Sequence, residues 1–244
     1  MGLSLQRDLL FQKEEYMTVR LLDLRAQQTN PFPRKKSSDG KIINTSKVVK
    51  GKTLVRDPKS ITGIGIHQTA CVFGPLNDRE KAYRRALGIP AHVTAFRDGV
   101  YVASAPLDWF LYHGNELNSF SLGLECEGHY PGLLDDPKTP IREDIKTTWG
   151  GTPTPLDDKA IETFRAALKW LVETGRAAGM PIEFIWAHRQ SNGQKPSDPG
   201  MGIWKHVVLD YGVPVLGLKT QTDKCWRDGK KIPVEWDPTG VGKY

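Results

Sequence analysis

The sequence predicts an α/β protein in which helices flank a mixed central β-sheet. Short apolar runs of strand composition, such as 61–66 and 182–187, occur beside a clear amphipathic helix over 157–178. Strand and helix signals mix without the regular alternation of βαβ units, so strands of both directions are expected in the sheet. A chain of 244 residues is long enough for one domain of ordinary size with an extension at each end.

The chain divides into three parts by composition. They are an N-terminal extension (1–58), a central domain (59–212) and a tail broken by prolines and glycines (213–244). In the extension, Leu3 to Gln12 has the pattern of a short helix, and Thr18 to Leu24 that of a strand or a helix end. Trp226 and Trp236 are the expected anchors of the tail.

Capping residues and glycines predict three helices. They span 77–87, 157–178 and 202–211, and glycines that favour helix ends follow them at positions 88, 179 and 212. Asn77 and Asp157 carry side-chain oxygens that can accept hydrogen bonds from free amides at the helix starts. The second helix has one apolar stripe, formed by Ile161, Phe164, Leu168 and Leu171.

Two further patterns predict strands and a loop. Asp98-Gly99 is a strong hairpin signal between strands at 92–96 and 100–103. Along 121–127, apolar residues alternate with Gly123, Glu125 and Glu127, as in a half-buried strand on the floor of a cleft. Residues 131–155 are rich in proline, glycine, aspartate and threonine and predict a long loop.

The overall composition is that of a soluble globular protein, with 39% hydrophobic and 25% charged residues. No apolar run reaches the ~20 residues that a membrane span requires. The first 17 residues lack the apolar core and cleavage site of a secretory signal, so we expect cytoplasmic synthesis without a signal peptide. Three widely spaced cysteines predict reduced thiols and no disulfide framework.

The net charge of +6 leaves two interpretations open. The first is an ordinary basic protein, and the second is attraction to a polyanion such as nucleic acid or an anionic cell envelope. Basic residues concentrate only at 34–36 and at Lys47, Lys50 and Lys52. Because aromatic and basic residues do not interleave, we expect no nucleic-acid partner.

Two histidines follow predicted buried strands. His67 ends the apolar run at 61–66, and His188 ends the run at 182–187, ten residues before Asp198. A strand end is rigid and opens to a cleft, so it can orient an imidazole. Two imidazoles and one carboxylate suit a catalytic zinc site, which keeps three protein ligands and leaves one position for water. From spacing alone, a single histidine at a strand end is more often a hydrogen-bonded structural residue.

Five short motifs occur in one order between Ser60 and Tyr211. They are Ile66-His67-Gln68-Thr69-Ala70, His92 with Arg97-Asp98-Gly99, His113-Gly114 with Asn118-Ser119, the run from Ser121 to Gly128, and Ala187-His188-Arg189 with Asp198-Pro199-Gly200. Together these motifs resemble the zinc-dependent N-acetylmuramoyl-L-alanine amidases of the type 2 amidase and peptidoglycan recognition protein family. The family's fold, a mixed sheet with helices on its faces, agrees with the fold predicted above.

The resemblance implies roles for particular residues. Zn²⁺ ligands are expected at His67, His188 and Asp198, and the catalytic glutamate is expected at Glu125. Three further positions are implied in substrate binding, with structural support as the open alternative for the two histidines: His92, His113 and Asn118.

Two positions depart from the family pattern. Ala91 stands where the family often has a tyrosine, and Pro196 stands where it usually has a catalytic-site lysine. Lys195, one residue earlier, is the candidate for the role of that lysine. If neither position serves, Glu125 carries the proton transfers alone.

The resemblance also implies an activity, which is hydrolysis of the amide between N-acetylmuramic acid and L-alanine in peptidoglycan. Glu125 would deprotonate a water whose pKa zinc lowers to about 7, and then return the proton to the leaving amine. The alternatives are a non-catalytic module that binds muropeptides and a zinc hydrolase of another amide. We expect a monomer that acts on peptidoglycan or muropeptide, either as a phage-type lysin released late or as a cytoplasmic recycling enzyme.

Overall fold

The computed structural model describes residues 18–37, 39–132 and 153–240. The helix predicted at 3–12 and most of the loop predicted at 131–155 lie outside these residues. Of the helices in the described ranges, none combines the length and apolar character that crossing a bilayer demands.

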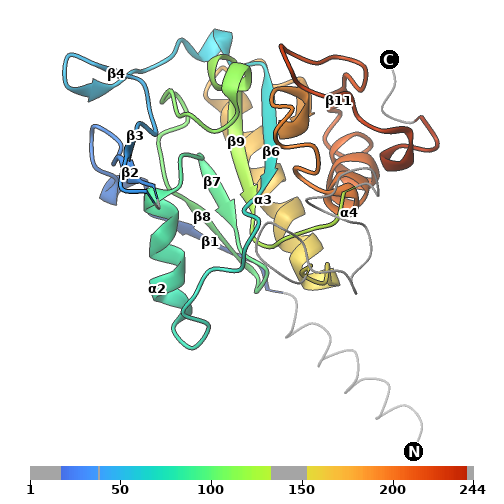
Figure 1. Ribbon diagram of the computed structural model, residues 1–244, viewed down its shortest axis with the longest axis horizontal. Coiled ribbons are helices and arrows are strands. Elements are labelled where there is room, and N and C mark those ends of the chain that lie inside the picture. Colours follow the sequence, from blue (N-terminus) through green and yellow to red (C-terminus); the bar gives the residue numbers. More distant parts are fainter. Residues whose placement is uncertain (1–17, 38, 133–152, 241–244) are drawn as a thin grey trace, which may run out of the picture.

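A seven-stranded mixed sheet forms the centre of the molecule (Figure 1). Its spatial order is β1 (Arg20–Asp23), β8 (Val100–Ala103), β7 (Val93–Ala95), β9 (Ser121–Cys126), β6 (Gly63–Gln68), β10 (Phe184–Ala187) and β11 (Lys219–Thr220). From β7 to β11 all neighbours are parallel, whereas β8 is antiparallel to β7 and parallel to β1. The predicted mixed sheet is therefore confirmed, including the hairpin of β7 and β8.

Helices cover the sheet and connect its strands. They are α2 (Arg79–Arg84), α3 (Asp158–Ala177) and the short α4 (Met201–Ile203), which continues as the π-helix η6 (Trp204–Gly212). Six 3₁₀ segments complete the set: η1 (Arg25–Gln27), η2 (Pro58–Ser60), η3 (Arg85–Gly88), η4 (Asn115–Ser119), η5 (His188–Gln190) and η7 (Val234–Trp236).

Two of the predicted helices differ in detail from expectation. The first begins at Arg79, because Asp78 caps it by accepting a hydrogen bond from the Lys81 amide at 3.1 Å, and Asn77 does not. After Arg84 it tightens into η3. The third predicted helix has the expected position, but most of it is wound as a π-helix.

The long helix α3 packs on one face of the sheet and explains the alternation in the strands. Asp157 caps α3 by accepting a hydrogen bond from the Ala160 amide at 2.8 Å. The stripe residues Phe164 and Leu168 are fully buried in one core cluster with Leu122 and Leu124 of β9. Burying each such side chain contributes roughly 1.5–3 kcal/mol. The apolar side of β9 thus faces α3, and its polar side faces the opposite way.

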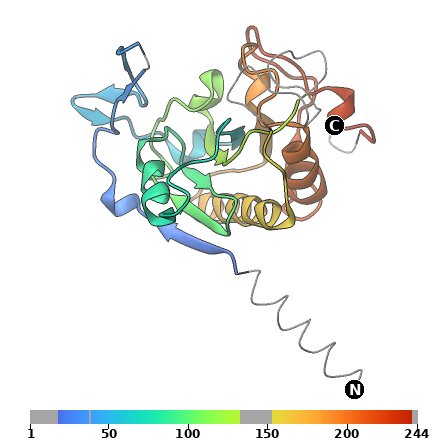
Figure 2. The ribbon, with the colours of Figure 1, turned by 60° about the horizontal axis from the view of Figure 1, so that its bottom comes forward.

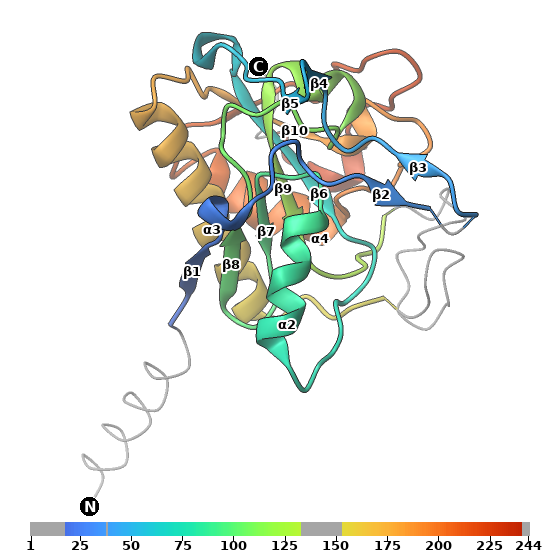
Figure 3. The ribbon, with the colours of Figure 1, turned by 90° about the vertical axis from the view of Figure 1, so that its left-hand side faces the viewer.

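Both ends of the described chain add edge strands to this sheet. β1 pairs with β8, and β11 pairs with β10, so segments outside the central domain extend the sheet on either side. Figure 3 shows β1 beside β8 at one edge. Two small antiparallel hairpins, β2 (Lys35–Lys36) with β3 (Ile42–Ile43) and β4 (Val48–Val49) with β5 (Lys52–Thr53), lie between β1 and β6 in the sequence.

Candidate metal centre and substrate pocket

Three parallel strands place three polar residues at their carboxyl ends, on the same side of the sheet. His67 lies near the end of β6 and is the direct register partner of Glu125 near the end of β9. His188 follows the last residue of β10, which pairs with Ile66 of β6. Ligands of open α/β sheets bind outside the carboxyl ends of parallel strands. The topology therefore gathers side chains that are up to 121 residues apart in the sequence.

The predicted ligand residues form one group. His67, His188 and Asp198 each offer a donor atom within 4.8 Å of the others, an arrangement that can hold a metal ion. Oδ2 of Asp198 is 2.9 Å from Nδ1 of His188 and 4.0 Å from Nδ1 of His67. The other carboxylate oxygen, Oδ1, accepts a hydrogen bond from the Gln68 amide at 2.8 Å. This bond fixes the carboxylate so that Oδ2 faces the two imidazoles.

A chain of hydrogen bonds determines which nitrogen of His67 faces Asp198. Nε2 of His113 lies 3.3 Å from the carbonyl oxygen of Ser121, which can only accept, so this nitrogen carries the proton. Nδ1 of His113 is then the acceptor for Nε2 of His67, 3.1 Å away. The neutral His67 ring therefore carries its proton on Nε2 and keeps a free lone pair on Nδ1.

Two glycines provide the space for His113. Gly65 of β6 and Gly123 of β9 are register partners on the polar face of the sheet. A Cβ atom would lie 3.1 Å from Cε1 of His113 at Gly65 and 2.8 Å from its Cγ at Gly123. Real Cβ atoms essentially never come as close as 2.8 Å to another heavy atom, so the His113 ring can occupy this position only because residue 123 has no side chain.

His92 is fully buried behind His113, with ring centroids 5.9 Å apart. Its Nδ1 accepts a hydrogen bond from the Gly123 amide at 2.9 Å, and its Nε2 lies 3.1 Å from the carbonyl oxygen of Trp109. These contacts support β9 from within the protein. A direct contact of His92 with substrate stays a prediction, and the hydrogen bonds favour its structural alternative.

The three buried imidazoles of His67, His92 and His113 are neutral. Burial lowers the pKa of His67 and of His92 well below the usual value, and neighbouring charges add to the effect. Burial, with the charges of Arg56 and His188, lowers the pKa of His113 to about 3. A neutral imidazole is the form that binds metal and that accepts a hydrogen bond.

The carboxyl group of Glu125 lies near the Asp198 carboxylate of the ligand group. Burial and the nearby Asp198 carboxylate raise the pKa of Glu125 to about 8, against the opposing positive charges of Lys195 and Lys35. Its Oε2 atom is buried and has no hydrogen-bond partner among the described residues. The effect of Lys195 on this pKa places its charge near Glu125, as the resemblance requires, although its catalytic role stays a prediction.

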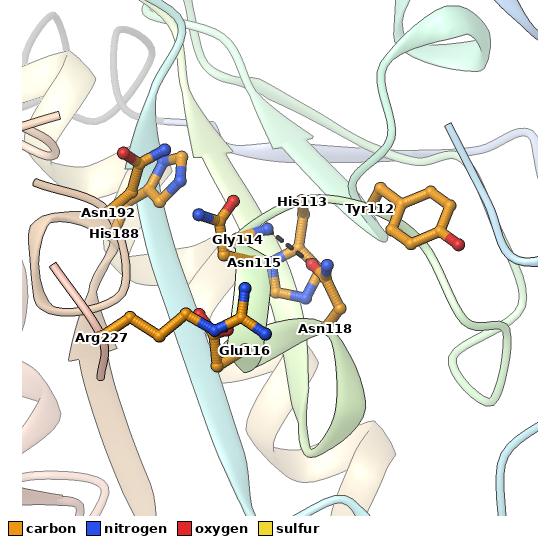
Figure 4. A pocket seen from close by; sticks show the side chains of 9 residues that line it. All are labelled: Tyr112, His113, Gly114, Asn115, Glu116, Asn118, His188, Asn192 and Arg227. Carbon is orange, nitrogen blue, oxygen red and sulfur yellow. Dashed lines mark hydrogen bonds and ion pairs between the residues drawn. The ribbon is translucent and has the colours of Figure 1, made fainter. Parts of the chain in front are cut away.

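A pocket of about 500 Å³ opens beside the His–His–Asp group. Figure 4 shows His113, His188 and Asn118 around it, with Arg227 reaching in from the tail toward Glu116. Arg227 and Glu116 form an ion pair. Asn118 is buried, and its Oδ1 accepts a hydrogen bond from the Gly114 amide at 2.6 Å, which fixes the turn that holds His113. The pocket therefore has an ion pair in its wall, with one partner from the tail, that the sequence motifs did not indicate.

The residues of the group fit a zinc ion. Imidazole nitrogens and a carboxylate oxygen are donors that zinc prefers, and three protein ligands leave a fourth position open. Nδ1 of His67, the ring nitrogen that faces Oδ2 of Asp198, is buried without a hydrogen-bond partner in the described part of the chain. Buried polar atoms without a partner cost about 1–3 kcal/mol each, so a bound ion or water at this place would be stabilised.

Fold and site together define an α/β protein with a buried His–His–Asp group that can hold a metal ion. The chain belongs to the Amidase_2 family, N-acetylmuramoyl-L-alanine amidase, whose family model matches residues 57–201. The matched range contains the three candidate ligands and Glu125, whereas Arg227 and the two small hairpins lie outside it. No match was found among curated proteins.

Several solved structures are similar to this chain. The N-acetylmuramoyl-L-alanine amidase LysC from Clostridium intestinale URNW is 14% identical with a TM-score of 0.44, over 83% of this chain and 100% of that one. The Ph2119 endolysin from a Thermus scotoductus MAT2119 bacteriophage is 16% identical with a TM-score of 0.40, over 78% and 97%. Wild-type Drosophila PGRP-LB is 16% identical with a TM-score of 0.42, over 88% and 99%. The family assignment rests on the family model.

Proposed function

We propose that the protein is a zinc-dependent amidase that cleaves the bond between N-acetylmuramic acid and L-alanine in peptidoglycan. The observation that carries this proposal is that the candidate metal-binding group and the Glu125 carboxyl lie on neighbouring, paired strands. The unpartnered Nδ1 of His67 faces Oδ2 of Asp198, and Glu125 is the register partner of His67 on the neighbouring strand. A metal-binding group beside a poised carboxylate is the arrangement that amide hydrolysis by water requires.

The proposed reaction adds water across the amide. The carbonyl carbon forms a bond to the water oxygen and loses its bond to nitrogen, which gives a carboxylic acid and a free amine. Glu125 accepts the proton that the attacking water loses and donates a proton to the leaving nitrogen. A zinc ion held by His67, His188 and Asp198 supplies Lewis-acid polarisation and lowers the pKa of water in the site.

Two cationic side chains complete the proposed site. The Lys195 ammonium stabilises the oxyanion that develops on the carbonyl oxygen, because its charge already acts on Glu125. Arg227, held by Glu116 in the wall of the pocket, binds a carboxylate of the peptide stem. His113 acts through His67, whose proton it fixes on Nε2.

A non-catalytic module that binds muropeptides is the second candidate function. It shares the family and the pocket but has no use for a carboxyl group of raised pKa beside the ligand group. The pairing of Glu125 with His67 on the neighbouring strand therefore favours the enzyme.

The test combines metal content, product identity and one variant. Purified protein is expected to contain about one zinc per chain by elemental analysis, and digestion of purified peptidoglycan should release free peptide stems whose mass identifies the cut at the lactyl amide. Treatment with a chelator should abolish release, and added zinc should restore it. Binding of muropeptide by the zinc-loaded protein without any release of stems would establish the recognition module instead.

A further inference from the structure

The positive charge of the protein is concentrated in one segment. Residues 34–59 contain nine lysines and arginines and two aspartates, a net charge of +7, whereas the whole chain carries +6. The remainder of the chain is therefore close to neutral. We call residues 34–59 the basic segment.

The structure turns the basic segment into a surface. It folds into the hairpins β2–β3 and β4–β5, which stand out from the body of the molecule (Figure 2). Six lysines of these hairpins are exposed: Lys35, Lys36, Lys41, Lys47, Lys50 and Lys52. Four β-branched side chains are exposed among them, with relative exposures of 59% for Ile42, 46% for Ile43, 43% for Val48 and 45% for Val49. Exposed apolar residues grouped among like charges are typical of an interaction site.

The basic segment is fixed to the rim of the pocket. The Lys47 amide donates to the carbonyl oxygen of Phe110 at 3.1 Å, and the Tyr112 amide donates to that of Thr45 at 2.8 Å. Ser46 and Leu111 form a β-bridge between these bonds. The strand-like stretch from Phe110 leads directly to Tyr112 and His113, which line the pocket. Lys47, and with it the β4–β5 hairpin that follows, is therefore held beside the rim of the pocket.

We propose that the basic segment binds the carboxylate-bearing peptidoglycan polymer next to the pocket, so that the enzyme acts on intact wall in preference to free muropeptide. This inference rests on the proposed function, because it names the form of the substrate. Charge complementarity supplies the attraction, and the exposed isoleucines and valines supply apolar contact with the polymer. The position on the pocket rim favours this polymer over a membrane, because a polymer bound in the pocket can extend from its rim to the adjoining hairpin.

Nucleic acid and anionic phospholipid are the other polyanions to compare with peptidoglycan. Residues 34–59 contain no aromatic side chain on which a base could stack. Single-stranded nucleic acid is bound by such stacking, so it is not the expected partner. An anionic phospholipid surface matches the charge and the aliphatic residues, and it is therefore an outcome that the experiment must distinguish.

The experiment uses one triple variant and one matched control. The test variant is Lys47→Gln, Lys50→Gln and Lys52→Gln in the second hairpin. The control is Lys205→Gln, Lys219→Gln and Lys231→Gln, which changes the net charge equally at exposed positions on η6, β11 and the tail. Equal melting temperatures of the variants and the unchanged protein show that folding is preserved.

Binding is measured by sedimentation with purified insoluble peptidoglycan. The test variant is expected to bind about tenfold more weakly, as three surface charge contacts of roughly 0.5 kcal/mol each would give, while the control stays within about twofold. Added salt should weaken binding of the unchanged protein, because the Debye length falls from about 10 Å at 0.1 M to about 3 Å at 1 M. The rate on insoluble wall should fall with binding, and the rate on a soluble muramoyl peptide should not.

Three outcomes would overturn the inference. One is undiminished wall binding by the test variant, and another is an equal loss in the test and control variants, which would show an effect of net charge alone. The third is lysine-dependent binding to phosphatidylglycerol vesicles together with unchanged binding to the wall. Failure of the proposed function is distinguishable, because it would appear as absence of hydrolysis of both substrates by the unchanged protein, whatever the binding results.

Discussion

Nε2 of His67 donates a hydrogen bond to Nδ1 of His113 over 3.1 Å. This bond leaves Nδ1 of His67, beside Asp198, unprotonated and with a lone pair that can bind a metal ion. Metal-binding histidines are commonly held by a partner on the second ring nitrogen, which fixes the tautomer and the ring orientation. In this protein the partner is another histidine, whose own proton is fixed by the Ser121 carbonyl. The hydrogen bond and the packing of the His113 ring can be tested separately by two substitutions of His113.

His113→Leu should weaken zinc binding by about 10–100-fold, because the His67 ring loses the acceptor that fixes its proton on Nε2. His113→Asn should keep the affinity within a few-fold, since its side-chain oxygen can take the place of Nδ1 as acceptor. Competition of each apo protein with a zinc-binding dye measures both affinities. Equal losses in the two variants would show that His113 fills space only.

Gly123→Ala should destabilise the protein and disturb the metal centre together. Its Cβ would lie 2.8 Å from Cγ of His113, so the ring or the strand must shift, which disturbs the hydrogen bond between His113 and His67. We expect a loss of roughly 1–3 kcal/mol in unfolding free energy, measured by urea denaturation, and weaker zinc binding. Gly88→Ala is the control, because a Cβ at Gly88 meets no atom within 4 Å. A Gly123→Ala protein with unchanged unfolding free energy and unchanged zinc binding would show that position 123 does not require glycine.

Glu125→Gln should lower the rate of stem release from peptidoglycan by about 10²–10⁴-fold, because the amide cannot accept the proton of the attacking water. Zinc content should stay at the level of the unchanged protein, since Glu125 is outside the ligand group. Product release is followed by mass spectrometry and metal by elemental analysis. Loss of zinc along with activity would make Glu125 a ligand or a structural residue.

The stability of the metal-free protein should depend on pH through Glu125. The folded state raises the pKa of this carboxyl from 4.5 to about 8, so between these values the folded state holds a proton that the unfolded chain has released. The protonated group therefore contributes stability that is complete below about pH 4.5 and is lost as pH rises through about 8. Glu125→Gln lacks this titration.

The check is urea unfolding of both proteins in chelator between pH 5 and pH 9. The unfolding free energy of the unchanged protein, taken relative to Glu125→Gln, should decline across this range and level off near its upper end. A constant difference would mean that the carboxyl has an ordinary pKa in the fold. Bound zinc should reduce the decline, because a nearby cation favours the carboxylate.

Much of the site could be predicted from the sequence because local patterns determine it. Alternation in β9 assigns Leu122 and Leu124 to the side that α3 covers and Glu125 to the other side, and the structure confirms this. His67 and His188 end strands, and strand ends meet where the strands are parallel and adjacent. The resemblance carried by the motifs predicted that Asp198 lies with His67 and His188, and the three residues do form one group.

Other features depend on contacts between distant segments, and no local pattern encodes them. The free nitrogen of His67 follows from a hydrogen bond to a ring 46 residues away, which two glycines of paired strands accommodate. Arg227 reaches the pocket only because the tail returns to Glu116. Lys47 and the hairpin that follows it lie beside the pocket only through backbone bonds of residues 45–47 to Phe110–Tyr112. The sequence by itself determined which side chains face which side of each strand, because that alternation is a property of the extended backbone. Only the tertiary structure decided which of their atoms meet, because register and loop packing set distances across the chain.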